Sequence, residues 1–129
     1  MKPLLFAAIL VVSIKALALE VEPFDSAEIT EAQFVQYHTS VAAELASTRR
    51  EYASHDLEVY SDEASRASLA FTLPGHPAHP AWVTRYVAVD DGGIYMNVVG
   101  YYAGDEAEFV KLYDQYKEMA EDTTNKFRQ

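Results

Sequence analysis

The chain has 129 residues, of which half are hydrophobic and 12% are aromatic. This length suits one ordinary domain, and this composition argues against disorder over most of the chain. The formal net charge is −10 at pH 7, which disfavours binding to nucleic acid and to anionic lipid head groups. The chain contains no cysteine, so disulfides, metal thiolates and thiol nucleophiles are excluded, and stability must come from the core.

The first 18 residues have the three parts of a secretory signal peptide. A short basic start, Met1-Lys2, precedes an apolar run over 4–14, and Ala16-Leu17-Ala18 fits a cleavage site. The run is shorter than the roughly 20 apolar residues that a membrane-spanning helix needs. We therefore expect 1–18 to be removed, leaving a periplasmic or secreted bacterial protein with no stable membrane insertion; an uncleaved anchor is the alternative. Cleavage would leave eight basic and 20 acidic residues, a formal charge of −12.

A helix is predicted to begin after Thr30. Thr30 and Gln33 form a capping-box pattern, and Ile29 and Phe34 occupy the two positions of a hydrophobic staple. An apolar stripe at steps of three and four then predicts a helix to about Ser54. The stripe consists of Phe34, Tyr37, Val41, Leu45, Thr48 and Tyr52.

Two short strands and a rigid loop are predicted to follow this helix. Residues 57–60 fit a short strand, and alternating apolar residues predict a second strand over 66–73. The segment 74–80 contains three prolines, which remove amide donors and favour extended backbone. It must therefore form a shaped surface loop.

The strongest local signal is a hairpin over 82–102 that turns at Asp91-Gly92. Its predicted register pairs Val89 with Ile94 and Trp82 with Tyr101, so one face is aliphatic and the other is aromatic. The aliphatic face carries Val83, Val87, Val89, Ile94, Met96 and Val98, interrupted by Arg85, whereas Trp82, Tyr86, Tyr95 and Tyr101 lie on the other face with Thr84, Asn97 and Val99.

A second capping pattern, Asp105 to Glu108, predicts a closing helix to about Glu121. The fold is thus expected to be α+β: a three- to four-stranded antiparallel meander between an N-terminal and a C-terminal amphipathic helix (α-β-β-β-α), in two layers. The domain should span 19–122, with a flexible C-terminal tail over 123–129. The aliphatic face is the natural floor for the helices, which would leave the aromatic face open to solvent or to a partner. The alternative is that the second helix covers the aromatic face.

The leading functional hypothesis is an exported binding or inhibitor-like module. Large aromatic side chains with polar tips are enriched at binding surfaces, and the acidic charge would attract a cationic protein partner. The predicted contact residues are Trp82, Tyr86, Tyr95, Asn97 and Tyr101.

Two other functions stay open. The sheet and helices could enclose a small apolar or aromatic ligand. Alternatively, His76 and His79 in the proline-rich loop could bind a divalent metal such as zinc, copper or nickel, although further ligands would be needed and a solvated loop is the simpler interpretation.

Catalysis finds little support, because the acidic pairs lie at turns, caps and helix ends where acids are common, and no nucleophile or phosphate-binding motif is present. No catalytic residue is therefore predicted, and an enzyme is the less favoured class. Arg85 is expected to lay its stem along apolar neighbours and its head at the rim of the sheet, with a buried pairing to a helix carboxylate and anion recognition as the alternatives.

Overall fold

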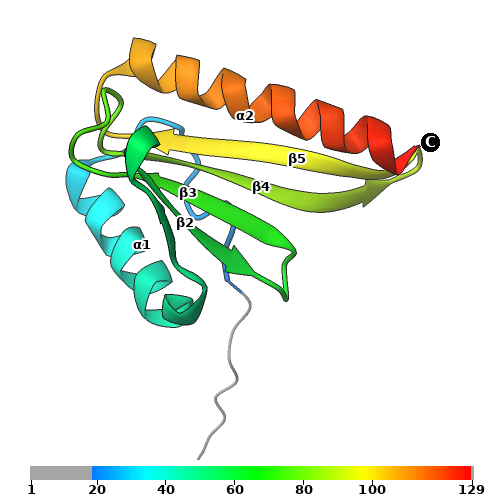
Figure 1. The fold of residues 1–129 in the computed structure, drawn as a ribbon, viewed down its shortest axis with the longest axis horizontal. Helices are drawn as coiled ribbons and strands as arrows, with labels where there is room; N and C mark the ends of the chain where they lie inside the picture. Colours follow the sequence, from blue (N-terminus) through cyan, green and yellow to red (C-terminus); the bar gives the residue numbers. More distant parts are fainter. Residues whose placement is uncertain (1–18, 129) are drawn as a thin grey trace, which may run out of the picture.

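The structure, a computed structural model, describes residues 19–128 (Figure 1). The predicted signal peptide at 1–18 and Gln129 lie outside the described residues. One helix, a five-stranded antiparallel sheet and a C-terminal helix follow one another along the chain. This confirms the α+β class and the order helix, sheet, helix, but the sheet has five strands rather than three or four.

The N-terminal helix α1, Glu31–Glu44, begins where the capping box predicted. The Gln33 amide donates to the Thr30 hydroxyl at 3.1 Å, and the Thr30 amide donates to the Gln33 side chain at 2.9 Å. Phe34, Tyr37 and Val41 are buried, which confirms the first part of the predicted apolar stripe.

The predicted end of this helix near Ser54 is wrong. The helix stops at Glu44, and the edge strand β1, Arg50–Tyr52, lies between two single 3-10 turns, Ala46–Thr48 and Ala53–His55. The Thr48 hydroxyl donates to the Leu45 carbonyl at 2.8 Å and accepts from the Ser61 amide at 3.0 Å. This side chain therefore bonds to backbone groups outside a regular helix, and the next residues pair with the sheet instead.

The other strands are β2, Leu57–Asp62; β3, Ala67–Thr72; β4, Ala81–Asp90; and β5, Gly93–Tyr102. Each strand pairs antiparallel with its neighbours in chain order. The hairpin register is the predicted one, with Val89 opposite Ile94 and Trp82 opposite Tyr101. Alternation and turn chemistry agree on this register, so it could be read locally.

The C-terminal helix α2, Glu106–Phe127, is capped by Asp105, whose carboxylate accepts from the Glu108 amide at 2.9 Å. The cap was predicted, but the helix runs past the expected end near Glu121. The segment 123–129, predicted as a tail, is helical as far as Phe127. The reason lies in the sheet, because the Thr124 hydroxyl accepts from the Met96 amide at 2.9 Å and fixes the last turns of the helix on β5.

The two helices pack on opposite faces of the sheet (Figure 1). Trp82 shares a core cluster with α1, whereas its neighbour Val83 shares another with α2. Successive strand residues point to opposite faces, so the sheet lies between the helices rather than forming one of two layers. The predicted common floor for both helices is therefore wrong: α1 covers the aromatic face and α2 covers the aliphatic one.

The outer edge of β5 is occupied by segments from both ends of the described chain. Tyr102 accepts from the Ile29 amide at 2.9 Å and donates to the Ala27 carbonyl at 2.8 Å. Further along the edge, Met96 bonds to Thr124 of α2. Unpaired strand edges invite pairing with other chains, and these contacts occupy part of that edge. No helix within residues 19–128 is both long and apolar enough to cross a membrane.

Candidate functional site

The predicted aromatic surface is not an open surface. Trp82 is fully buried and Tyr101 is 2% exposed. The Trp82 ring lies 4.6 Å from the Tyr37 ring and 5.4 Å from the Phe71 ring, in stacked geometry. The Tyr101 hydroxyl donates to the Phe24 carbonyl at 3.2 Å. Neither of these predicted contact residues is therefore open to a partner in this structure: α1 presents its own aromatic stripe to this face, and the N-terminal segment covers the rest.

The other three predicted residues, Tyr86, Tyr95 and Asn97, are half-buried. The Tyr86 hydroxyl donates to Glu22 at 2.5 Å and accepts from the Asn97 amide at 2.8 Å. Burial and the bond to Glu22 raise the pKa of Tyr86. Tyr86 and Asn97 therefore hold the N-terminal segment on the sheet, and the five residues do not form one contact surface.

The histidines of the proline-rich loop bond within the loop and to its neighbouring strand. His76 accepts from the Ala78 amide at 3.0 Å through Nδ1, and His79 Nδ1 lies 2.8 Å from the Thr72 hydroxyl. Burial lowers the pKa of His76. Within residues 19–128, no three or more His, Asp or Glu side chains are placed to hold a metal ion, so the structure brings no third ligand to this pair.

The opposite face of the sheet contains an open groove. Helix α2 packs mainly over β5 and part of β4, and two adjoining hollows lie on the face beside it. Their volumes are about 690 Å³ and 410 Å³, and both are lined by Ser68 and Arg85. We call this pair of hollows the Arg85 groove. The smaller hollow is also lined by Tyr52, His55, Leu57, Val59, Gln115, Tyr116 and Met119.

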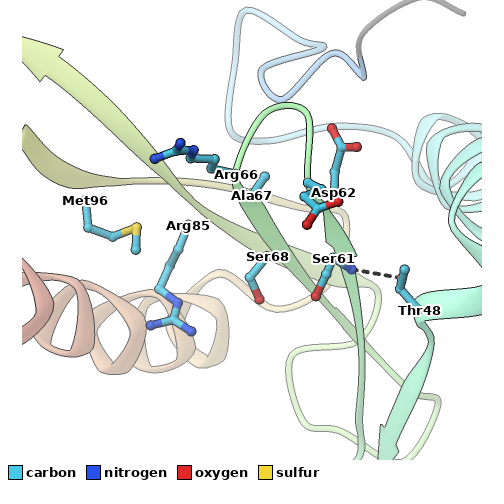
Figure 2. A pocket seen from close by; sticks show the side chains of 9 residues that line it. Thr48, Ser61, Asp62, Arg66, Ala67, Ser68, Arg85 and Met96 are labelled. Carbon is cyan, nitrogen blue, oxygen red and sulfur yellow. Dashed lines mark hydrogen bonds between the residues drawn. The ribbon is translucent and has the colours of Figure 1, made fainter.

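The larger hollow is the more polar half of the Arg85 groove (Figure 2). Figure 2 shows Arg85 extending from β4 toward α2, with Arg66 and Asp62 on the far side of the hollow. Apart from the shared residues, this hollow is lined by Thr48, Ser61, Asp62, Glu63, Arg66, Ala67 and Met96.

The strand register explains why this groove is open. Ser61 pairs with Ser68, and Ser68 pairs with Arg85, so the three form one row across the face. Two small side chains on β2 and β3 fill little space beside α2. The sequence therefore places short residues where a closed core would need large ones.

Arg85 is the principal charge in the floor of the groove. Its guanidinium carbon lies 5.5 Å from the centre of the Tyr116 ring. Its Nε atom is buried and has no hydrogen-bond partner, and Arg85 takes part in none of the ion pairs found within residues 19–128. Burial raises the pKa of the Tyr116 hydroxyl, and the positive charge of Arg85 opposes that rise. The groove thus holds a cation whose charge no side chain of the described chain neutralises directly.

Three acidic side chains of α2 line a neighbouring surface instead of the smaller hollow. Asp114, Glu118 and Glu121 gather there with Lys111 and Lys117, and Gln115 borders both surfaces. None of the residues lining the smaller hollow is an Asp or a Glu. The chain as a whole has 20 acidic residues and is negative, whereas this half of the groove has Arg85 and no acidic side chain among its lining residues.

A second polar cluster lies under α1 and serves the fold. The Glu58 carboxylate is buried and bonds to His38, to Arg49 at 2.7 Å and to the Tyr60 hydroxyl at 3.1 Å. Burial acts to raise the pKa of Glu58, but the bonds from His38 and Arg49 outweigh it and hold the pKa below its ordinary value. These bonds connect α1 and the segment after it to β2.

The chain matched no protein-family model, no curated protein and no solved structure. Sequence reasoning singled out Arg85 as a charge on an apolar strand face but did not include it among the predicted site residues. Tyr116 and Met119 lie within the predicted closing helix, and no local pattern marks either of them as a site residue.

Proposed function

We propose that this protein binds a small molecule with an apolar or aromatic body, which the Arg85 groove holds between α2 and the sheet. The observation that carries the proposal is the buried, unpartnered Nε of Arg85 at the point where two hollows meet. If residues 1–18 are removed on export as predicted, the ligand is met outside the cytoplasm.

The size and lining of the groove support this function. Ligand sites are commonly clefts of roughly 300–1,000 Å³ with mainly apolar walls and a few polar groups that orient the ligand. The smaller hollow has a volume of about 410 Å³, with Leu57, Val59, Tyr116 and Met119 among its walls. These side chains offer apolar contact, and Arg85 supplies a fixed polar contact.

Binding fits the groove better than catalysis does. A guanidinium stays protonated at any physiological pH, so it attracts and orients a ligand but does not accept a proton from it. Ser68 stands opposite Arg85 in the strand register, so the side chain beside its hydroxyl is a guanidinium and not a base that would activate it as a nucleophile.

The hypothesis of a cationic protein partner depended on an exposed aromatic face of the sheet. Trp82 and Tyr101 were to be the aromatic anchors, and both are buried in the core. The net charge of −10 still favours cationic molecules in general, but it also serves solubility. We therefore do not propose a partner protein as the function.

The test uses a fluorescent apolar probe, N-phenyl-1-naphthylamine, titrated into the purified protein. We compare two tryptophan substitutions on α2, Met119→Trp at the groove and Val110→Trp away from it, where the native side chains are 44% and 46% exposed. Because the indole would narrow the smaller hollow only from position 119, we expect Met119→Trp to weaken probe binding at least fivefold and Val110→Trp to leave it unchanged. Native mass spectrometry of the untreated protein should also detect a co-purified small molecule.

Two results would contradict the proposal. One is the absence of saturable probe binding together with repeated mass spectra free of any bound compound. The other is equal binding by the two tryptophan variants, which would place the probe outside the groove.

A further inference from the structure

We infer that the Arg85 groove selects ligands with a single oxyanion head, such as a carboxylate or a sulfonate, attached to an apolar body. The head would bind the Arg85 guanidinium beside Ser68, and the body would lie in the smaller hollow against Tyr116 and Met119. This inference rests on the proposed function and specifies the charge and the orientation of the ligand.

Arg49 and Arg85 differ in whether a carboxylate of this chain pairs with them. Arg49 is fully engaged by this acidic chain, with Glu58 at 2.7 Å and Glu51 at 3.0 Å. Within the described part of the chain, Arg85 has no such ion pair, although its Nε is buried. A partly buried charge is costly unless a counter-charge or hydrogen bonds satisfy it. A ligand oxyanion would supply both, and a guanidinium fork matches the geometry of a carboxylate.

Charged side chains are distributed unevenly around Arg85. Among residues 19–128, none that lines the smaller hollow carries a carboxylate, and the α2 acids Asp114, Glu118 and Glu121 line a neighbouring surface beyond Gln115. No acidic group of that hollow therefore competes with a ligand for the guanidinium. Arg85 is the one Arg, Lys, Asp or Glu among the described residues that line this hollow, in a molecule that is negative as a whole.

The side chains around Arg85 indicate how the ligand would be oriented. Tyr116 faces the guanidinium of Arg85 with its ring at 5.5 Å, an arrangement in which the ring attracts the cation and limits its movement. Ser68 lies directly opposite Arg85 in the register, where a hydroxyl can donate to the same oxyanion. The apolar walls lie on the side of Leu57 and Met119, so the body extends that way from the head.

The lining of the larger hollow favours a ligand with only one negative charge. Beyond Ser68 and Arg85, the larger hollow is lined by Asp62 and Glu63 as well as Arg66. The Asp62 carboxylate accepts from the Ser65 hydroxyl at 2.6 Å, which fixes it at this rim. Apart from Arg85, this lining has two carboxylates and one guanidinium, so a second anionic group reaching into the hollow would meet a net negative charge.

The experiment compares two probes that differ by one sulfonate group: 8-anilinonaphthalene-1-sulfonate and the neutral N-phenyl-1-naphthylamine. We expect the unmodified protein to bind the sulfonate at least tenfold more tightly, with a preference that shrinks as salt rises. Arg85→Met keeps the length and apolar contact of the stem but removes the charge, so it should abolish the preference. Lys117→Met makes the same charge change on another side of α2 and should leave the preference intact.

The outcomes separate this inference from the proposed function. If the neutral probe binds in the groove and the sulfonate binds no better, or if Arg85→Met keeps the preference, the oxyanion inference is wrong and the proposed function stands. If neither probe binds, the proposed function fails as well. Circular dichroism checks that Arg85→Met is folded. If it is not, Arg85→Lys decides: loss of the bidentate fork should reduce the sulfonate preference at least threefold, and an unchanged preference would overturn the inference.

Discussion

The contact between Gly100 and α2 gives a prediction whose size can be worked out from the structure. Gly100 lies on β5 beneath the Phe109 ring, and a Cβ atom at this position would approach Phe109 Cζ to 2.7 Å and Tyr113 Cδ1 to 3.1 Å. Phe109 is buried and stacks on Tyr102 with a centroid distance of 4.8 Å. Neither ring can move without disturbing the packing of α2 on the sheet.

Gly100→Ala should therefore destabilise the protein. Overpacking of a closed core costs about 1–3 kcal/mol, and the lower entropy of the unfolded alanine chain offsets about 0.4–1 kcal/mol of this. We expect a net loss of about 1–2 kcal/mol in the free energy of unfolding, measured by urea denaturation followed by circular dichroism. Gly92→Ala is the matched control, because its nearest contact is the exposed Asp90 side chain at 3.3 Å, and it should lose less than about 0.5 kcal/mol.

A double-mutant cycle tests the proposed cause. Phe109→Leu removes the Cζ atom that the new methyl group would meet, so the double variant should be more stable than the sum of the two single effects by about 1 kcal/mol. Additive effects would refute the reasoning, because the cost of the methyl group would then come from somewhere other than the Phe109 ring.

Three further changes test other parts of the fold. Trp82→Ala should lose about 3–5 kcal/mol of unfolding free energy in urea, since the ring is fully buried; a loss below about 1 kcal/mol would contradict its core position. The pKa of Glu58 is lower in the folded protein than its ordinary value of 4.5, so ionised Glu58 stabilises the fold above pH 4.5, and this effect is lost as pH falls through the folded-state pKa. Glu58→Gln should therefore weaken the fall of the unfolding free energy at acid pH, and an unchanged fall would contradict this role of Glu58. Thr124→Val should cost about 1 kcal/mol and speed hydrogen exchange at the Met96 amide, whereas unchanged exchange would show that the amide is protected otherwise.

The parts of the fold that sequence predicts well are those decided within a few residues. The hairpin register follows from Asp91-Gly92 and from alternation on either side, and the start of α1 follows from Thr30 and Gln33. The end of α1 could not be read in this way. Leu45, Thr48 and Tyr52 continue a helical period, but pairing of β1 with β2 and the bonds of Thr48 override it.

The choice of face also depends on tertiary structure. Alternation determines which residues share a face, but not which helix covers it. The aromatic face is covered by α1 because Phe34 and Tyr37 match the rings of the sheet, a fit that involves segments far apart in the chain. The long-range contact of Tyr101 with Phe24 completes this cover, and no local signal indicates it.

The candidate site was visible in the sequence only as one unusual residue. Arg85 stands out because a charge interrupts an aliphatic strand face, which is a local observation. Its neighbours in the smaller hollow include residues of β1, β2, β3 and α2, and the register of β3 on β4 sets Ser68 opposite Arg85. Tyr52 and Met119 are brought to one hollow by that register and by the position of α2, so no spacing rule could have joined them.

The closure of the β5 edge has a consequence for the order of folding. The Ile29 amide bonds to the Tyr102 carbonyl along this edge, and the Met96 amide has its partner only once Thr124 has been synthesised. Loop closure over so long a stretch of chain is slow compared with formation of the hairpin itself. During synthesis the hairpin can form while α2 is still incomplete, so its edge stays available to other chains until the last turns arrive. A protein shortened before Thr124 should therefore lose solubility in newly made chains before it loses secondary structure.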